Sequence, residues 1–355
     1  MMNYKETLFF VGKCLTITYE EHNRKIVERE IKSGNVDWDT IVKLSTEHYV
    51  FPALYCNLKR AKLLYHLPEE LVNYMKHITD LNRERNQQII EQAKEINELL
   101  LANNITPIFL KGTGNLLEGL YEDIGERMVG DIDFIVSKVK FKETIEILAS
   151  YRYHKVYDTN SEIFSFKHYP RLKKQNKIAA IEIHKELIIE KYSKEFNYLF
   201  VKKDAFLQNN STFLSYKNQL SLSIIAYQIN DDGQHFNTIA LRNSYDVFLL
   251  SKKVNSLKAI EQFNKLFHPL NNYIALSNKI LGQVSSLEYR QTGRIKRVLT
   301  INNKLLESAS FRKWNQKTWS CYLFIKVRLN IIIKSIYDKH TRAWLIKRII
   351  NGKQN

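Results

Sequence analysis

Two aspartates, Asp131 and Asp133, are the polar exceptions in an apolar stretch at residues 129–136. The surrounding valine, isoleucine and phenylalanine residues favour a β-strand, in which residues i and i+2 point to the same face. Both carboxylates would therefore project together from a buried strand. Like charges side by side repel unless a cation neutralises them, and Mg²⁺ prefers carboxylate oxygens. The pair predicts a divalent metal site.

A later stretch of the same kind, residues 178–184, carries Glu182 and His184 on one face of a predicted strand. If this strand lies beside the one that bears Asp131 and Asp133, three carboxylates form a cluster. Glu182 is then the third metal ligand, and its alternative is a charge at a sheet edge. For His184, support of the metal shell or of an acceptor is the functional interpretation, and a hydrogen-bonded structural histidine is the alternative.

A glycine turn lies upstream of both stretches, where an apolar run ends at Lys111, Gly112 and Thr113. A turn of small residues that opens a helix lets backbone amides approach phosphate oxygens, and the helix N-terminus favours negative charge. The Thr113 hydroxyl could donate to phosphate, and Lys111 and Arg127 are the nearest cations that would reach it. Ordinary surface cations are the alternative for these two residues. Carboxylates with a phosphate cradle suit nucleotidyl transfer, in which two metal ions serve the acceptor and the triphosphate.

These motifs resemble the uncharacterised bacterial nucleotidyltransferase family within the DNA polymerase β-like superfamily. The resemblance covers roughly residues 36 to 255 and rests on the following segments: Leu110-Lys111-Gly112, Arg127, Gly130 to Val136, Ile181 to His184, Trp38, Val50-Phe51-Pro52, Leu241-Arg242 and Tyr245-Asp246. Two features depart from the superfamily pattern. Thr113 stands where Ser or Gly is usual, and the separation between Gly112 and Asp131 is longer than in compact members.

The resemblance implies an α+β fold with a polymerase β-like core flanked by helical regions. It also implies an NTP substrate, a hydroxyl acceptor, and two Mg²⁺ ions, with Mn²⁺ as a substitute, held by Asp131, Asp133 and Glu182. The predicted regions are N-terminal helices (1–104), a catalytic core (105–200), C-terminal helices (201–310) and a basic tail (311–355).

Periodicity and turn residues predict the elements that would position these side chains. Expected strands are at residues 105–110, 130–136, 154–157, 163–168 and 178–184, with a turn and helix at 111–121. Expected helices are one from 38 capped by Asp37 and ending or bending at Pro52, one at 81–101, one after Ser137 as cap, one through Leu220, Ile224 and Tyr227, and one at 241–249.

Arg242 and Asp246 are four residues apart in the last of these helices. A salt bridge along the helix is the default interpretation of that spacing. A supporting role in nucleotide or acceptor binding is the alternative.

The composition indicates a globular chain, with 44% hydrophobic residues in 355, and its net charge of +17 suggests an anionic partner. Cys14, Cys56 and Cys321 are far apart and form no CxxC pattern, so we expect no zinc site and no disulfide partner. The N-terminal apolar run is too short for a signal peptide, and no long uncharged stretch predicts a spanning helix. A cytoplasmic location is expected.

The tail differs from the rest of the chain in charge. From Arg312 onward, eleven Lys and Arg residues stand against one acid, Asp338, which gives +10 of the total +17. One interpretation is a helix that buries Leu323, Val327 and Ile331 against the body. Docking on an anionic membrane surface, which would make the protein peripheral, and RNA binding are the others.

Two further functions use the same motifs. A metal-dependent glycosyltransferase also binds a nucleotide sugar through Asp-x-Asp, but it gives Lys111 to Thr113 no role. A degenerate, inactive member would hold nucleotide or RNA without chemistry.

Overall fold

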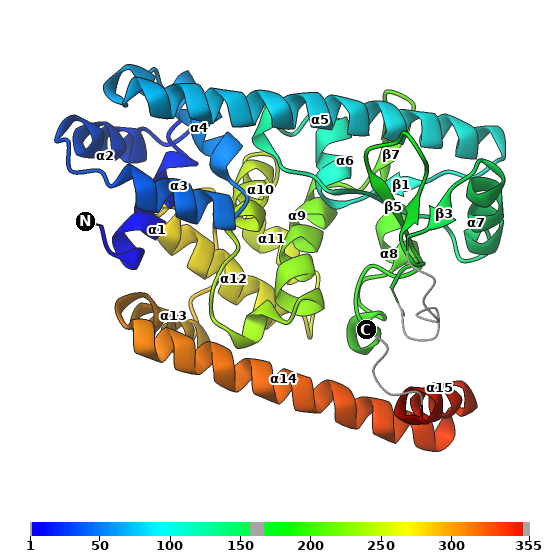
Figure 1. Ribbon diagram of the computed structural model, residues 1–355. Helices are drawn as coiled ribbons and strands as arrows, with labels where there is room; N and C mark the ends of the chain where they lie inside the picture. Colours follow the sequence, from blue (N-terminus) through cyan, green and yellow to red (C-terminus); the bar gives the residue numbers. More distant parts are fainter. Residues whose placement is uncertain (1, 157–166, 351–355) are drawn as a thin grey trace.

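The computed structural model describes residues 2–156 and 167–350 (Figure 1). An N-terminal group of helices comprises α1 (Tyr4–Cys14), α2 (Glu21–Lys32), α3 (Trp38–Glu47), α4 (Phe51–Arg60) and α5 (Glu69–Ala102). The Asp37 carboxylate accepts a hydrogen bond from the Thr40 backbone N–H at 3.2 Å, so the predicted cap of α3 is confirmed. Pro52 lies in the first turn of α4, where its missing N–H leaves no helical bond unmade.

Helix α5 is the longest element and joins the two halves of the molecule, running along the helical group and on past the sheet (Figure 1). It has 34 residues and begins twelve residues before the predicted start at Leu81, directly after Pro68. Buried amides on α5 bind backbone carbonyls that belong to the core. Asn86 donates to the carbonyl of Arg127 at 2.7 Å, and Gln92 donates to that of Ala179 at 3.0 Å.

A mixed seven-stranded sheet forms the core, in the order β3-β4-β5-β2-β1-β7-β6. The strands are β1 (Ile108–Phe109), β2 (Asp131–Ile135), β3 (His154–Lys155), β4 (Leu172–Lys173), β5 (Ala180–His184), β6 (Phe206–Gln208) and β7 (Ser211–Phe213). β2 and β5 are parallel neighbours at the centre. Together with the flanking helices, this sheet confirms the predicted α+β class.

Several strand predictions were too long or missed an element. β1 covers two residues of the predicted 105–110, and β3 covers two of 154–157, of which Tyr157 lies outside the described residues. Of the predicted strand 163–168, residues 163–166 also lie outside them, while His168 forms an isolated bridge to His184. β4, β6 and β7 were not predicted, because two or three residues are too few for an alternating pattern.

Helices α6 (Lys111–Glu118) and α7 (Phe141–Ser150) flank the sheet. Ser137 was the predicted cap of α7, but the cap position is Lys140, so that prediction was wrong. After α8 (Tyr198–Lys202) and β7, helix α9 (Tyr216–Ile225) continues into a π-helical turn, η5 (Ala226–Asn230). The remaining helices are α10 (Leu241–Ser251), α11 (Ser256–Glu261), α12 (Phe267–Ile280), α13 (Gly293–Glu307), α14 (Ala309–Tyr337) and α15 (Lys339–Ile350).

One hydrophobic core extends from Leu8 in α1 to Leu306 in α13. The tail does not join it as predicted: Val327 is 52% exposed, so its expected burial was wrong, and Leu323 and Ile331 are only partly buried and are not among the residues of this core. Among the described residues, no helix is both long and apolar enough to cross a bilayer. All three cysteines are free thiols, and only Cys321 is exposed. The four-region division of the chain stays a prediction.

Candidate active site

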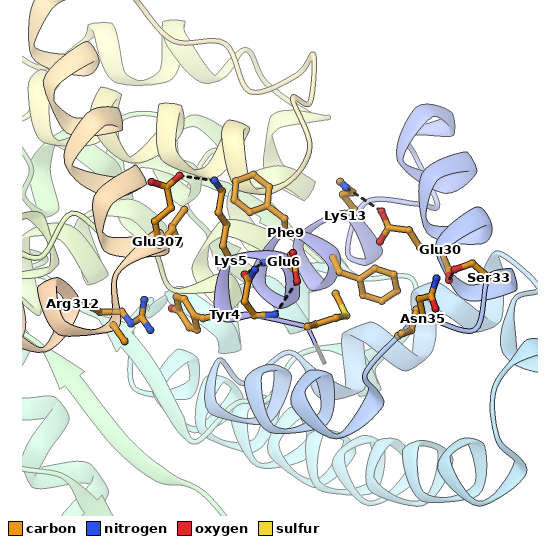
Figure 2. Close-up of a pocket in the computed structure, with 16 residues that line it drawn as sticks. Tyr4, Lys5, Glu6, Phe9, Lys13, Glu30, Ser33, Asn35, Glu307 and Arg312 are labelled. Atoms are coloured by element: carbon orange, nitrogen blue, oxygen red, sulfur yellow. Dashed lines mark hydrogen bonds and ion pairs between the residues drawn. The ribbon is translucent and has the colours of Figure 1, made fainter.

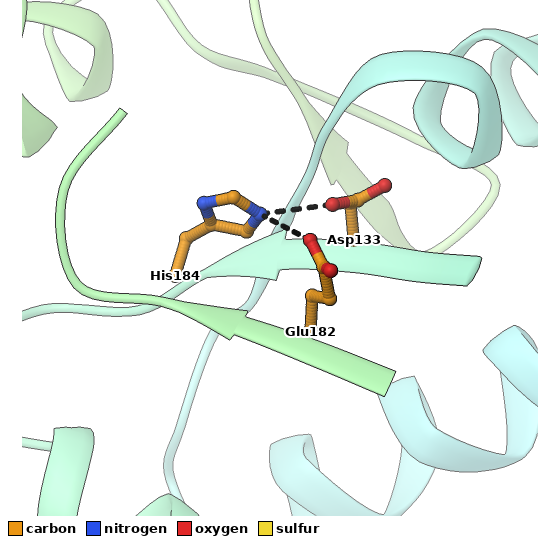
Figure 3. Close-up of side chains that lie close together, drawn as sticks. All are labelled: Asp133, Glu182 and His184. Atoms are coloured by element: carbon orange, nitrogen blue, oxygen red, sulfur yellow. Dashed lines mark hydrogen bonds and ion pairs between the residues drawn. The ribbon is translucent and has the colours of Figure 1, made fainter. Parts of the chain in front are cut away.

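The register of β2 and β5 brings the acidic residues together. Asp133 lies opposite Glu182, and Ile135 lies opposite His184, so the two strands present Asp133, Glu182 and His184 on one face (Figure 3). One ligand atom from each of these three residues lies within 4.8 Å of the others. The predicted pairing of the two strands is confirmed, and the histidine is part of the cluster that it creates.

Lys111 is the cation closest to the centre of this cluster. Its Nζ lies 2.6 Å from Asp133 Oδ1 and 3.6 Å from Glu182 Oε2. His184 Nε2 shares the same oxygen, at 2.8 Å from Asp133 Oδ1, and lies 3.6 Å from Glu182 Oε2. Two nitrogen groups thus converge on the atoms that would bind a metal.

Arg171 closes the other side of the cluster and was not foreseen from the sequence. Its Nη2 lies 2.9 Å from Asp131 Oδ2, and its Nε donates to Glu182 Oε1 at 2.7 Å. Arg171 directly precedes β4, one of the strands that was missed. Because β4 pairs with β5, the fold sets this guanidinium between Asp131 and Glu182.

The two carboxyls that Arg171 joins differ in their pKa shifts. Burial alone would raise the pKa of Glu182, but the nearby His184, the charge of Lys111 and the hydrogen bond from Arg171 together hold that pKa far below its ordinary value. For Asp131, burial raises the pKa and outweighs the opposing effect of Arg171. Glu182 is therefore the more firmly ionised of the two.

The donor set fits a divalent cation. Asp133 and Glu182 supply hard carboxylate oxygens, which suit Mg²⁺ and Mn²⁺, and the His184 imidazole is a ligand that Mn²⁺ also accepts. Asp131, the other predicted ligand, is not part of this group of three and is linked to Glu182 through Arg171. A divalent cation on these oxygens would replace the charge that Lys111 and Arg171 supply to them. Both basic side chains would then be released toward negatively charged groups of a ligand.

The glycine turn borders the acidic cluster, as predicted. Lys111 has a left-handed backbone (φ 52°), and a Cβ on Gly112 would lie only 2.9 Å from Val129 Cγ2, so a larger residue at position 112 would force the Val129 side chain to shift. The first N–H groups of α6 lack acceptors within the helix. The Thr113 side chain is buried, and its hydroxyl donates to the backbone carbonyl of Asp131 at 2.6 Å, which ties α6 to β2.

Arg127 is buried and paired with Asp246. The distance between Arg127 Nε and Asp246 Oδ1 is 3.0 Å. Tyr121 donates its hydroxyl to the same carboxylate at 2.8 Å. The default salt bridge between Arg242 and Asp246 was therefore wrong: Asp246 turns inward to Arg127. The pair connects the loop before β2 with α10, two segments far apart in the chain.

A cavity of about 490 Å³ lies between the sheet and the C-terminal helices, and it is lined by the acidic cluster together with Lys111, Gly112, Arg127, Arg171 and Asp246. Its lining also includes Lys167 from the segment before β4, Asn230 and Asp231 from the end of η5, and Arg242 from α10. Burial lowers the pKa of Arg242, and so does its neighbour Arg127; its guanidinium lies 5.0 Å from the centre of the Tyr49 ring. π-helical turns such as η5 are frequent at functional sites.

A larger cavity, of about 930 Å³, lies elsewhere, between α1, α2 and the start of α14 (Figure 2). Its charged side chains are already partnered: Lys5 pairs with Glu307 at 2.8 Å, and Lys13 lies 3.7 Å from Glu30. It holds no grouping of carboxylates comparable to the β2–β5 face. The smaller cavity is therefore the candidate active site.

Sequence reasoning missed Lys167, Arg171 and Asp231, and their spacing carries no signal, because tertiary folding alone brings them to the acids. The positions of the asparagine residues in α5, by contrast, do carry a signal in the sequence. Asn82 and Asn86 continue the apolar stripe that Ile89 and Ala93 extend, and a polar residue on a buried stripe predicts a buried hydrogen bond.

A family model described as an uncharacterised nucleotidyltransferase matches residues 34–278, more than half of the chain. The chain belongs to this family. The match includes every residue of the acidic cluster and the glycine turn, and it ends before α13. Neither the curated proteins nor the solved structures contain a match. Family membership and the metal-competent Asp/Glu/His group together support nucleotidyl transfer at this site.

Proposed function

We propose that this protein transfers an NMP group from an NTP to a hydroxyl acceptor, with release of pyrophosphate. The observation that carries the proposal is the strand register that sets Asp133 beside Glu182, at the start of α6. A carboxylate cluster next to unpaired helix N–H groups serves both halves of this chemistry. The acids would bind the metal, and the backbone N–H groups of the turn would bind the phosphates.

Asp131, Asp133 and Glu182 would hold Mg²⁺, two ions in the full site, with Mn²⁺ as a substitute and His184 as a further ligand. The bound ions supply charge that activates the acceptor hydroxyl and stabilises the leaving pyrophosphate. The protein's own residues bind and orient. Gly112 and the first N–H groups of α6 bind the triphosphate, and Glu182, being ionised, accepts the hydrogen bond of the acceptor hydroxyl.

The basic residues of the cavity would neutralise the rest of the triphosphate. Lys111 is the first of these, since a metal ion held by Asp133 would compete with the contact between Lys111 and that carboxylate and would leave the ammonium group for the phosphates. Arg242 is the second, because it also lines the cavity and its guanidinium has no carboxylate partner among the described residues. Arg127, held by Asp246, lines the cavity and fixes the position of the loop before β2.

The test is a transfer assay with α-labelled NTPs, Mg²⁺ or Mn²⁺, and cell extract as the source of acceptors. We expect labelled acceptor and free pyrophosphate, and we expect Asp133→Asn to lower the rate on the order of 10³-fold or more, because a metal ligand is lost. Asp39→Asn, on the exposed face of α3, is the matched control and should retain full activity.

Three results would refute the proposal. Full turnover in Asp133→Asn would remove the metal site from the chemistry. Release of a nucleoside diphosphate from a nucleotide sugar would indicate a glycosyltransferase. Calorimetric binding of NTP without turnover across extracts would indicate an inactive binding module.

A further inference from the structure

Helices α14 and α15 differ from the other helices in what they leave exposed. The first part of α14 is attached to the body: Asn315 donates to the carbonyl of Phe236 at 3.1 Å, and the Trp319 ring lies 4.9 Å from the His235 ring. Arg312 donates to the carbonyl of Leu305 at 2.6 Å. Beyond these contacts the helix continues along the edge of the molecule to α15 (Figure 1).

Past the attachment, α14 carries a row of exposed apolar side chains. Their exposed fractions range from 50% for Ile325 to 71% for Ile336, and the row comprises Ile325, Leu329, Ile332 and Ile336. The spacing of three and four residues places these side chains on one face of the helix. Further exposed apolar residues are Phe324, Val327, Ile333 and Tyr337 in α14 and Ile346, Ile349 and Ile350 in α15. This number of exposed apolar side chains indicates an interaction surface.

The corner between α14 and α15 is built by specific bonds. Asp338, the single acid after Arg312, accepts from the Thr341 N–H at 3.1 Å. Arg342 donates to the carbonyls of Ser335 at 2.8 Å and Ile336 at 2.6 Å, which are among the last of α14. The corner thus holds the apolar row and the basic residues of both helices in one unit.

The charge of this unit indicates which class of partner it would bind. Lys326 and Arg328 are exposed within the stretch that carries the apolar row, Lys317 is exposed on the same helix before it, and the tail as a whole carries +10. A second copy of the chain would bring two such charges together, which is repulsive. RNA would be bound through phosphate contacts and stacked aromatic rings, but isoleucine and leucine do not stack on bases. Aliphatic side chains flanked by Lys and Arg, whose long stems reach past the apolar layer, suit a bilayer of anionic lipid.

We propose that α14 and α15 form a docking surface for an anionic lipid bilayer. The aliphatic row enters the boundary between headgroups and acyl chains, and the basic side chains contact lipid phosphates. This binding is separate from nucleotidyl transfer and needs neither metal nor NTP.

The test is cosedimentation of the full chain with vesicles of phosphatidylglycerol and phosphatidylcholine, against vesicles of phosphatidylcholine alone. We expect binding to the anionic vesicles only, weakened by added salt. A charge variant with Lys317→Gln, Lys326→Gln and Arg328→Gln should bind on the order of 100-fold more weakly. An apolar variant with Ile325→Ser, Leu329→Ser and Ile332→Ser should also lose binding.

A matched control removes three exposed lysines elsewhere, with Lys94→Gln, Lys203→Gln and Lys265→Gln, and should bind the anionic vesicles nearly as well as the parent. Circular dichroism and thermal unfolding check that each variant is folded. The proposal fails if the control loses as much binding as the charge variant, or if the apolar variant binds normally. Binding to single-stranded RNA that is lost only in the charge variant would assign the surface to RNA, and dimers in sedimentation would assign it to a second copy.

Discussion

The acidic face of β2 and β5 and the surface of α14 and α15 both concentrate charge, but they handle it in opposite ways. In the active site, each carboxylate of the cluster has a cation beside it: Lys111 contacts Asp133, and Arg171 contacts both Asp131 and Glu182. On the tail, a net charge of +10 stands with a single acid. The negative charge of the site is neutralised by basic residues of the protein itself, whereas the positive charge of the tail would be neutralised by an anionic partner.

The difference has an energetic basis. A buried charge without a partner costs several kcal/mol, and in the acidic cluster Lys111 and Arg171 offset that cost. An exposed Lys or Arg carries no such cost, because water solvates it. Carboxylates that are paired with cations inside the protein can therefore stay ionised in a buried site. Basic side chains that are exposed without acids around them are instead available to bind a large anionic partner.

The largest expected effect on stability comes from the pair of Arg127 and Asp246. Asp246→Asn leaves the buried Arg127 guanidinium without its counter-charge, and we expect a loss of about 3–5 kcal/mol in the free energy of unfolding. Denaturant unfolding monitored by circular dichroism measures it. Asp204→Asn, which removes the partly exposed partner of Lys217, is the control and should cost less than about 1 kcal/mol. Equal losses in the two variants would contradict the contrast between buried and exposed charge.

The sequence predicted the parts of the site that lie on one strand or one turn. The alternation at Asp131 and Asp133 and at Glu182 and His184 indicated which side chains share a face, and the sheet confirmed that the strands are neighbours. It could not predict Arg171 or the partner of Asp246, because these contacts join segments brought together only by β4 and α10. The exposure of Val327 could not be predicted from the sequence either, because the helical pattern indicates an apolar face but not whether another element covers it.

An intermediate effect is expected when Lys111 is removed. In Lys111→Met the cluster of Asp133 and Glu182 loses its nearest cation, so a divalent ion meets less competition. We expect Mn²⁺ to bind on the order of ten times more tightly, while NTP binds more weakly because a phosphate contact is lost. Isothermal titration with Mn²⁺ and with NTP measures the two separately.

Lys138→Met is the matched control for this experiment, because Lys138 pairs with Glu186, an acid outside the cluster. Its affinity for Mn²⁺ should equal that of the parent. Weaker Mn²⁺ binding in Lys111→Met would show that Lys111 supports the metal site and does not compete with the metal.

The smallest effect is expected on the tail, where two leucines give a direct comparison. Leu250 in α10 is fully buried, and Leu250→Ala should cost about 2–5 kcal/mol through lost packing and the cavity left behind. Leu329 in α14 is 52% exposed, and Leu329→Ala, which keeps a good helix former, should change the free energy of unfolding by less than about 0.5 kcal/mol in lipid-free buffer. Both values come from the same denaturant titration. A loss of several kcal/mol in Leu329→Ala would mean that the apolar row packs within the protein, and the contrast between a self-contained site and an open docking surface would no longer hold.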